Sequence, residues 1–244
     1  MTHAQKLMSA TATVAITLAL STSALANPLA GWSGEAALTG SKTTGNTETT
    51  DIGLALDLTK TDGPWRNKFN ASFDYGETSN IKNRQRLVLG YQIERDINDR
   101  LFGYANADYF QDDFGAFETG YFVGGGLGYK LVLPEPLAWD ITGGAGYRSQ
   151  KTQGPLSVTE NEFALNGRSE IDYQFNDAVS AYNNTEILWS DSDTYIWNEV
   201  GLTAQLMGNL AARASFRIDN HSTVPLGREK TDTITRIGVV YTLN

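Results

Sequence analysis

The chain contains no cysteine among its 244 residues. Disulfide bonds therefore cannot stabilise the fold, and a lipid anchor on cysteine cannot form. Histidine is nearly as scarce, because His3 and His221 are the only two. A zinc site built from His and Cys ligands is excluded by these counts, and we expect neither a metal nor another cofactor.

Basic side chains are also in short supply. The sequence has 19 Lys and Arg against 28 Asp and Glu, a net charge of -9. A nucleic-acid-binding protein needs a basic face to meet the phosphate backbone. The composition therefore excludes nucleic acid as a partner.

Long apolar runs are absent too, since no stretch approaches the roughly 20 residues that a membrane-spanning helix requires. The one short run, "VAITLAL", follows the basic side chain of Lys6 and precedes the triplet Ala24-Leu25-Ala26. This arrangement is typical of a cleaved secretory signal peptide, here residues 1–26, although a retained N-terminal anchor is the alternative. We expect residues 27–244 to be exported and to form one domain.

What the sequence does contain is alternation of apolar and polar residues. In "DIGLALDLTK", Ile52, Leu54, Leu56 and Leu58 share one face of an extended strand, and polar or small residues share the other. The same alternation continues to the last residues, "TDTITRIGVVYTLN". We predict twelve strands, at 31–41, 51–60, 65–76, 84–94, 100–110, 121–131, 137–148, 161–175, 178–189, 194–206, 210–219 and 231–244. In 100–110 the apolar face is ambiguous, because Phe102 and Tyr104 oppose Leu101 and Tyr109.

The lengths of the strands and their connections indicate a membrane. Strands of soluble proteins usually have about 5 to 6 residues, whereas membrane-spanning strands have about 9 to 11. Short turns such as "TDGP" and "ND" alternate with longer polar segments such as "SKTTGNTE", "GETSNIKN" and "STVPLGREK". This pattern predicts an all-β fold, an antiparallel transmembrane β-barrel whose last strand pairs with its first. A soluble β-sandwich or lipocalin-like barrel, with the apolar rows inside, is the alternative.

Two further patterns fit a barrel in a membrane. Glycine-rich "GGGLG" and "TGGAG" could face each other on neighbouring strands. Aromatic residues near strand ends could form girdles at the two membrane interfaces. The candidates for these girdles are Trp32, Trp65, Trp139, Tyr147, Trp189 and Tyr241.

Several segments carry a family resemblance: "GNTETTDIGLALDLTKTDGPWRNKFNASFDYGE", "LFGYANADYFQDDF" and "EKTDTITRIGVVYTLN". They resemble a bacterial family of salt-induced outer-membrane proteins, which is a domain-of-unknown-function family. The resemblance implies a barrel in the outer membrane of a Gram-negative cell, with no established activity. The chain departs from many such barrels by ending in Leu243-Asn244 instead of an aromatic residue, so the barrel-assembly machinery would read Tyr241 or bind more weakly.

The rows expected to face the lumen carry both charges. Arg213, Arg217 and Arg236 form a basic strip on neighbouring strands, and Glu162, Glu170 and Asp172 form an acidic row. The basic strip could guide anionic solutes, or it could be neutralised by Glu35 and the acidic row. The function we expect is a narrow, porin-like channel for small or anionic solutes linked to salt or envelope stress. The alternative is a structural envelope protein whose lumen is closed by ion pairs.

Other polar residues suggest weaker hypotheses. Asp112, Asp113, Asp191 and Asp193 lie in acidic loops that could hold a divalent cation or cross-link lipopolysaccharide through one. His221 adjoins Ser222, but adjacent strand residues point to opposite faces, so a lipid-hydrolysing enzyme is the least favoured function. We expect a non-enzymatic monomer whose partners are outer-membrane lipid, lipopolysaccharide and the barrel-assembly machinery.

Overall fold

A computed structural model describes residues 30–45, 49–78, 81–131, 134–154 and 156–243. The predicted signal peptide, residues 1–26, lies outside the described residues, as does Asn244. No helix within the described ranges is long and apolar enough to cross a membrane.

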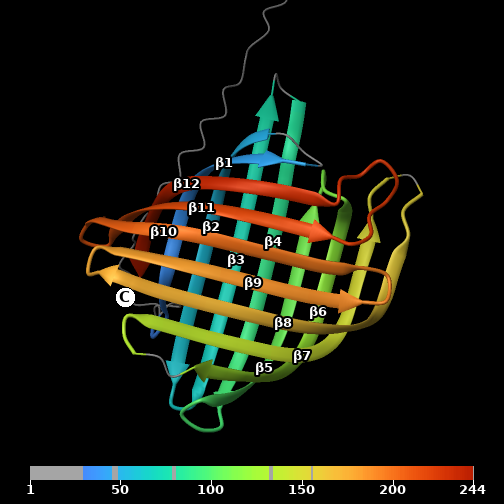
Figure 1. Cartoon of the computed structure of the whole chain (residues 1–244). Helices are drawn as coiled ribbons and strands as arrows, with labels where there is room; N and C mark the ends of the chain where they lie inside the picture. The colour runs from blue at the N-terminus through green and yellow to red at the C-terminus, as the bar shows by residue number, and fades with distance from the viewer. Residues whose placement is uncertain (1–29, 46–48, 79–80, 132–133, 155, 244) are drawn as a thin grey trace, which may run out of the picture. The chain divides into compact units, whose positions relative to one another are not determined.

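Twelve antiparallel strands form a closed barrel in which each strand pairs with its neighbours in the sequence (Figure 1). The strands are β1 (Ser33–Thr44), β2 (Thr49–Asp62), β3 (Trp65–Thr78), β4 (Ile81–Asp96), β5 (Leu101–Asp112), β6 (Phe117–Leu131), β7 (Leu137–Thr152), β8 (Thr159–Asn176), β9 (Val179–Ser190), β10 (Thr194–Met207), β11 (Leu210–His221) and β12 (Thr231–Leu243). The last strand closes the barrel against the first, with Leu243 opposite Gly34 and Thr233 opposite Thr44. The predicted all-β barrel of twelve strands is confirmed.

The apolar rows face outward and the polar rows face the lumen. On β2, Ile52 is 66% exposed, whereas its neighbour Asp51 is only 3% exposed. The same contrast appears on β11, where Phe216 is 41% exposed and Asp219 is 5% exposed. A soluble barrel would have the opposite arrangement, so this is the transmembrane type of barrel.

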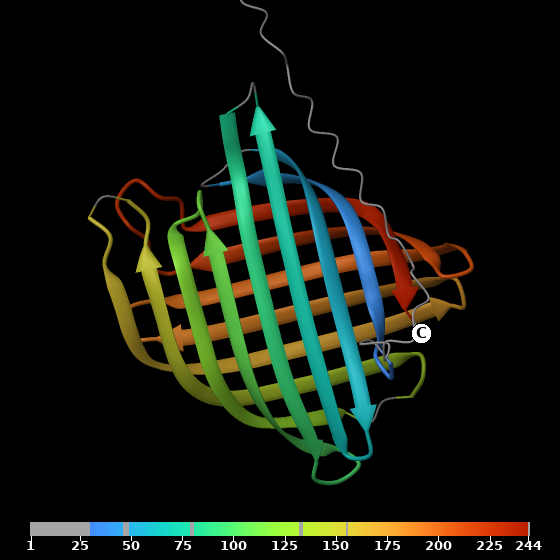
Figure 2. The ribbon, with the colours of Figure 1, turned by 180° about the vertical axis from the view of Figure 1, so that it is seen from behind.

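The connections differ between the two ends of the barrel, which we call the turn end and the loop end. The connections that follow β2, β4, β6, β8 and β10 lie at the turn end, and those that follow β1, β3, β5, β7, β9 and β11 lie at the loop end. Two predicted loops were wrong in extent, because the first half of "SKTTGNTE" and most of "GETSNIKN" belong to strands. Polar side chains of these segments contact neighbouring strands and loops: Thr43 donates to Asp51, and Lys82 pairs with Asp113. The hairpin of β3 and β4 consequently projects beyond its neighbours at the loop end (Figure 2).

Strand β5, whose faces the sequence left ambiguous, points Phe102 and Tyr104 into the barrel and Tyr109 outward. Phe102 is 1% exposed and Tyr104 is 7% exposed, whereas Ala105 and Ala107 face outward. Glycines on the adjoining strands make room for these rings: a Cβ on Gly128 would lie 2.1 Å from the Phe102 ring. Over residues 102–107 the strand therefore has small residues on its lipid-facing row and aromatic residues on its inward row, which is the reverse of the other strands.

The two glycine-rich segments face each other, as the sequence suggested. Gly124 lies opposite Gly146, and Gly126 lies opposite Gly144, so β6 and β7 form a glycine strip along the inner wall. A Cβ on Gly126 would lie 2.2 Å from the carbonyl oxygen of Gly143, a backbone atom that cannot move aside.

The predicted aromatic residues divide between the two ends of the barrel. Trp65, Trp139 and Tyr241 lie toward the turn end, and Tyr147 and Trp189 lie toward the loop end. Trp32 directly precedes β1, beside the turn end. Trp65 is 41% exposed and Tyr241 is 52% exposed. Their contact with the membrane interface stays a prediction.

We predict that Gly126→Ala destabilises the barrel by about 2 kcal/mol, the size of an overpacking defect. The matched control is Gly103→Ala on the neighbouring strand, where the nearest atom to an added Cβ is 3.9 Å away. Urea unfolding followed by heat-modifiable gel migration measures both. Equal stability of the two variants would contradict close packing at the glycine strip.

Candidate functional site: the charged lumen

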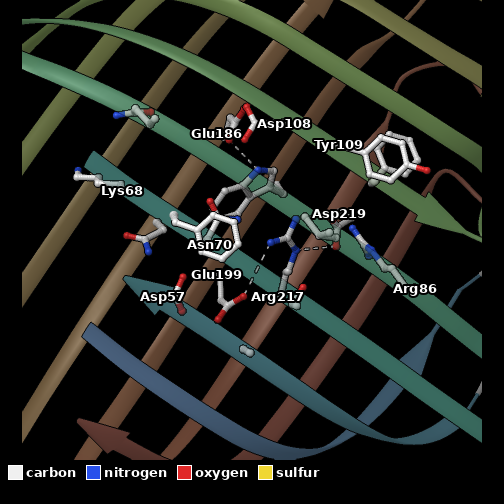
Figure 3. A pocket seen from close by; sticks show the side chains of 18 of the residues that line it. Asp57, Lys68, Asn70, Arg86, Asp108, Tyr109, Glu186, Glu199, Arg217 and Asp219 are labelled. Carbon is white, nitrogen blue, oxygen red and sulfur yellow. Dashed lines mark hydrogen bonds and ion pairs between the residues drawn. The ribbon is translucent and has the colours of Figure 1, made fainter. Parts of the chain in front are cut away.

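A cavity of about 980 Å³ lies inside the barrel. Its lining residues run from Glu35 and Thr242 near the turn end to Gly115 and His221 near the loop end. Figure 3 shows that the labelled side chains around it are mostly charged. The cavity therefore follows the length of the wall and is dominated by ionic groups.

Every basic side chain that points into the lumen has a carboxylate partner. These residues are Arg66, Lys68, Arg84, Arg86, Lys130, Arg148, Arg168, Arg213, Arg217 and Arg236. Burying a charge is costly unless it is paired, so the pairing follows from the closed barrel.

Arg217 is the most heavily partnered member of the predicted basic strip. Its Nη2 lies 2.8 Å from Asp219 Oδ1, and its Nη1 lies 4.0 Å from Glu199 Oε2 (Figure 3). The guanidinium also lies 4.3 Å from the centre of the Trp197 ring and donates to the Tyr195 hydroxyl at 3.0 Å. Two carboxylates and two aromatic rings thus hold this positive charge on the wall.

The other two arginines of the strip are also paired. Arg213 reaches across β12 to Glu35 on β1, with Nη2 donating to Oε2 at 2.8 Å. Arg236 lies 3.3 Å from Asp74 and 3.7 Å from Glu199. The structure brings all three arginines to the lumen, but none presents an unpaired charge there.

Three polar contacts cross the lumen to β8, the strand that carries the predicted acidic row. Lys68 on β3 lies 3.7 Å from Glu170, and Arg168 donates to Gln92 on β4 at 3.4 Å. Closer to the loop end, Asn166 donates to the Tyr104 hydroxyl at 3.0 Å. These contacts join walls that are several strands apart and narrow the passage.

Away from the loop end, four inward carboxylates have no basic side chain in ion-pair contact within the described part of the chain, whereas Glu160 and Glu162 at the loop end accept hydrogen bonds from Gln150 and Ser192. The four are Asp57 on β2, Asp108 on β5, Asp140 on β7 and Asp172 on β8. Asp140 lies directly opposite Glu170 in the register, and Asp172 is the next inward residue of β8. The unpaired charges of the lumen are therefore negative. Asp108 escaped the sequence analysis because the faces of β5 could not be assigned.

A buried polar cluster at the loop end surrounds Asp193, which is 2% exposed. Its carboxylate accepts from Arg148 Nη2 at 3.0 Å, from the Thr223 amide at 3.0 Å and from Ser222 Oγ at 3.1 Å, and lies 2.6 Å from His221 Nδ1. Burial by itself would raise the pKa of Asp193, but these donors outweigh it and hold that pKa well below its usual value.

His221 is held between two aromatic rings in the same cluster. The centre of its ring lies 4.9 Å from that of Phe117 and 4.6 Å from that of Tyr195. Ser222 donates its hydroxyl to Asp193, which leaves it without the base that a serine nucleophile needs. The arrangement favours a structural role for His221.

The remaining acidic residues of the loops bind protein groups. Asp112 accepts from the amides of Phe114 and Gly115 at 3.1 and 3.0 Å. Asp113 pairs with Lys82 at 3.3 Å, and Asp191 is exposed. Glu162, at the loop end of β8, accepts from the Ser192 amide at 2.9 Å. Within the described ranges no three His, Asp or Glu residues are placed to hold a metal, so the divalent-cation sites stay predictions.

Comparison with known proteins places the chain in a family. The model of a family described as "Protein of unknown function, DUF481" matches residues 36–243. The chain belongs to the DUF481 family. This confirms the predicted domain-of-unknown-function family, while salt induction is not part of that description. A search of curated proteins gives no match.

Solved structures similar to this DUF481 barrel include a porin, an outer membrane channel and the translocator domain of an autotransporter. The NanC porin aligns with a TM-score of 0.58 at 12% identity, covering 85% of this chain and 100% of its own. An outer membrane channel from Pseudomonas putida F1 aligns with a TM-score of 0.52 at 10% identity, covering 86% and 95%. The translocator domain of the autotransporter NalP from Neisseria meningitidis has a TM-score of 0.51 at 14% identity, covering 86% and 88%. At these identities the likeness concerns the fold alone.

We predict that Asp193→Asn destabilises this DUF481 barrel by about 3 kcal/mol at pH 7, because it leaves a buried arginine without its carboxylate. A lowered pKa stabilises the fold above the unfolded value of about 3.8, and this contribution declines as pH falls toward the folded value. The stability difference between wild type and variant should therefore be full at pH 7 and shrink below about pH 4. Urea unfolding at pH 7 and pH 3 measures it, and a difference independent of pH would contradict the assigned role. Asp191→Asn, in the same loop but exposed, is the control.

Proposed function

We propose that this barrel is a narrow channel of the outer membrane that admits small solutes and prefers cations. The observation that carries the proposal is the charge balance of the lumen. Each inward Lys or Arg is held by a carboxylate, whereas Asp57, Asp108, Asp140 and Asp172 have no such partner. Rings of unpaired carboxylates favour cations in a pore.

The anion preference expected from the basic strip has less support. Arg213, Arg217 and Arg236 are each bound to a carboxylate, so an entering anion would have to compete with Glu35, Asp219 or Asp74. An entering cation meets carboxylates that no basic side chain of the described residues holds in a direct ion pair. The preference for small solutes follows from the polar contacts that cross the lumen, since open water channels need barrels of about 16 to 18 strands.

The proposed location also rests on the outer surface of the barrel. Its apolar outward rows match the band that a lipid bilayer requires, and the similar structures include a protein named as a porin and one named as an outer membrane channel. We place the loop end outside the cell, which leaves the start of β1 and the end of β12 on the periplasmic side. Lipopolysaccharide would then surround the loops, and the barrel-assembly machinery would insert the chain.

We predict small current steps in planar bilayers and a reversal potential that indicates cation preference under a salt gradient. The double variant Asp140→Asn, Asp172→Asn should reduce the excess cation preference by roughly half, because two of four unpaired carboxylates lose their charge. Asp177→Asn, an exposed residue in a connection at the turn end, serves as the control and should behave like wild type. An anion-selective reversal potential would overturn the proposal.

The second candidate is a structural envelope protein with a closed lumen. The contacts of Lys68 with Glu170 and of Arg168 with Gln92 favour it, because they bridge opposite walls. The same recordings separate the two functions. If properly folded protein carries no current at any voltage, the barrel is closed and the channel proposal fails.

The link to salt stress rests on the family resemblance of the sequence, and we extend it to this chain as a proposal. We predict that its message rises when the osmolarity of the medium is raised. Quantification of the transcript before and after a salt shift measures this, with an unrelated outer-membrane barrel of the same cell as the control. A flat response would remove the stress link and leave the channel proposal untouched.

A further inference from the structure

The lipid-facing wall carries an unusual polar stripe on β8, β9 and β10. Ser169, Thr185 and Asn198 lie side by side, because Ser169 is opposite Thr185 and Thr185 is opposite Asn198 in the strand register. All three belong to the outward rows, which alternate with the inward residues Arg168, Glu186 and Trp197. Asn183, the next outward residue of β9, extends the stripe toward the turn end.

This polar stripe lies within the apolar band of the wall. On its loop-end side are Leu165, Ile187 and Ile196, which are 46%, 44% and 37% exposed. On its turn-end side are Val200 and Leu202, which are 46% and 49% exposed. Polar groups at this depth face hydrocarbon, which offers no hydrogen bond.

The stripe satisfies part of its own hydrogen-bonding capacity. Asn198 Nδ2 donates to Thr185 Oγ1 at 2.7 Å and to Asn183 Oδ1 at 3.3 Å. Ser169 Oγ accepts from Trp139 Nε1 at 3.0 Å. Among the described residues, no protein group bonds the side-chain nitrogen of Asn183 or the side-chain oxygen of Asn198. One amide donor and one amide acceptor are therefore left facing the membrane.

The outer wall beside the stripe also lacks large side chains. Gly143 on β7 and Gly167 on β8 lie opposite each other on the outward rows. An added Cβ on Gly143 would meet nothing within 4 Å, and one on Gly167 would first meet Ile187 at 3.7 Å. Small residues beside hydrogen-bonding side chains are the composition of contacts between membrane-spanning segments.

We propose that the polar stripe is the contact surface of a homodimer, formed by two barrels side by side in the bilayer. The unsatisfied groups are complementary to each other, because Asn183 offers a donor and Asn198 an acceptor. In a twofold arrangement each Asn183 can donate to Asn198 of the other copy, so a single geometry forms the bond twice. The stripe is uncharged, so two copies meet without repulsion.

The opposite wall of the barrel has no such polar stripe among its described residues, which supports a contact surface specific to β8, β9 and β10. The outward rows of β1, β2 and β3 present Leu38, Leu54 and Phe73 in the band, with exposures of 50%, 45% and 39%. Lipid tails cover such side chains without loss. The dimer replaces the monomer expected from the sequence, whose alternation alone gave no sign of association.

The absence of cysteine allows a direct test, since single cysteines introduced into the chain have no competitor. Thr185→Cys, at the centre of the stripe, should form a disulfide-linked dimer when purified barrels in liposomes are oxidised at low protein-to-lipid ratio. Leu54→Cys, on the opposite wall and more exposed than Thr185, is the control and should cross-link only at the background rate despite its greater exposure. Equal rates for the two variants would overturn the proposal.

A second measurement leaves the Thr185 hydroxyl in place. Sedimentation of the wild-type protein in detergent should give a dimer that dissociates on dilution, and Asn198→Leu should weaken the association by at least about threefold, the average effect of one hydrogen bond in a membrane. Heat-modifiable migration verifies that the variant forms a barrel. A wild type that is monomeric at every concentration, or a dimer unaffected by Asn198→Leu, would show that the stripe is not the contact.

Discussion

The pairing of β12 with β1 is the constraint on which the rest of the structure depends. Hydrocarbon cannot bond a peptide N–H or C=O, so a sheet that spans a membrane must leave no edge. Closure in turn separates the two faces of every strand completely, one toward lipid and one toward a confined lumen. Arg213 illustrates the consequence, because it reaches past β12 to Glu35 and holds the closing strands together from the inside. Backbone hydrogen bonds and an ion pair thus both stabilise the junction between β12 and β1.

The confinement of charged side chains inside the barrel explains why the lumen is rich in ion pairs and why it still carries an excess of negative charge. An arginine on an open surface can remain solvated without a partner, but inside a barrel it lies within reach of several walls. Arg168 contacts β9 through Glu186 and β4 through Gln92, and Lys68 contacts both Glu94 and Glu170. Because the inward acids outnumber the inward bases, complete pairing of the bases leaves a remainder of carboxylates. The excess of acidic over basic residues in the sequence therefore appears in the lumen as carboxylates without an ion-pair partner.

The sequence predicted the strands and their faces wherever one row was clearly apolar, as on β2 with Ile52, Leu54 and Leu56. It could not assign β5, because the decisive factor lies on other strands: Phe102 turns inward where Gly128 leaves room for its ring. Alternation also placed Arg213, Arg217 and Arg236 on the lumen side. It named Glu35, which pairs with Arg213, but it could not identify Asp74 as the partner of Arg236, because these two residues lie far apart in the chain. The loop boundaries were predicted too wide because the sequence analysis assigned polar residues to loops, whereas the row of a strand that faces the lumen is polar as well.

The polar stripe of β8 to β10 could not be predicted from the sequence pattern of any single strand. Ser169, Thr185 and Asn198 occupy outward positions in regular strands, so nothing in the local pattern marks them apart from their polarity. Only the register brings them into one row, and only the closed barrel turns that row toward lipid. A polar row costs free energy there unless something covers it. Where a fold follows one rule around most of its wall and departs from it on three adjoining strands, the departure is the first place to look for a contact surface.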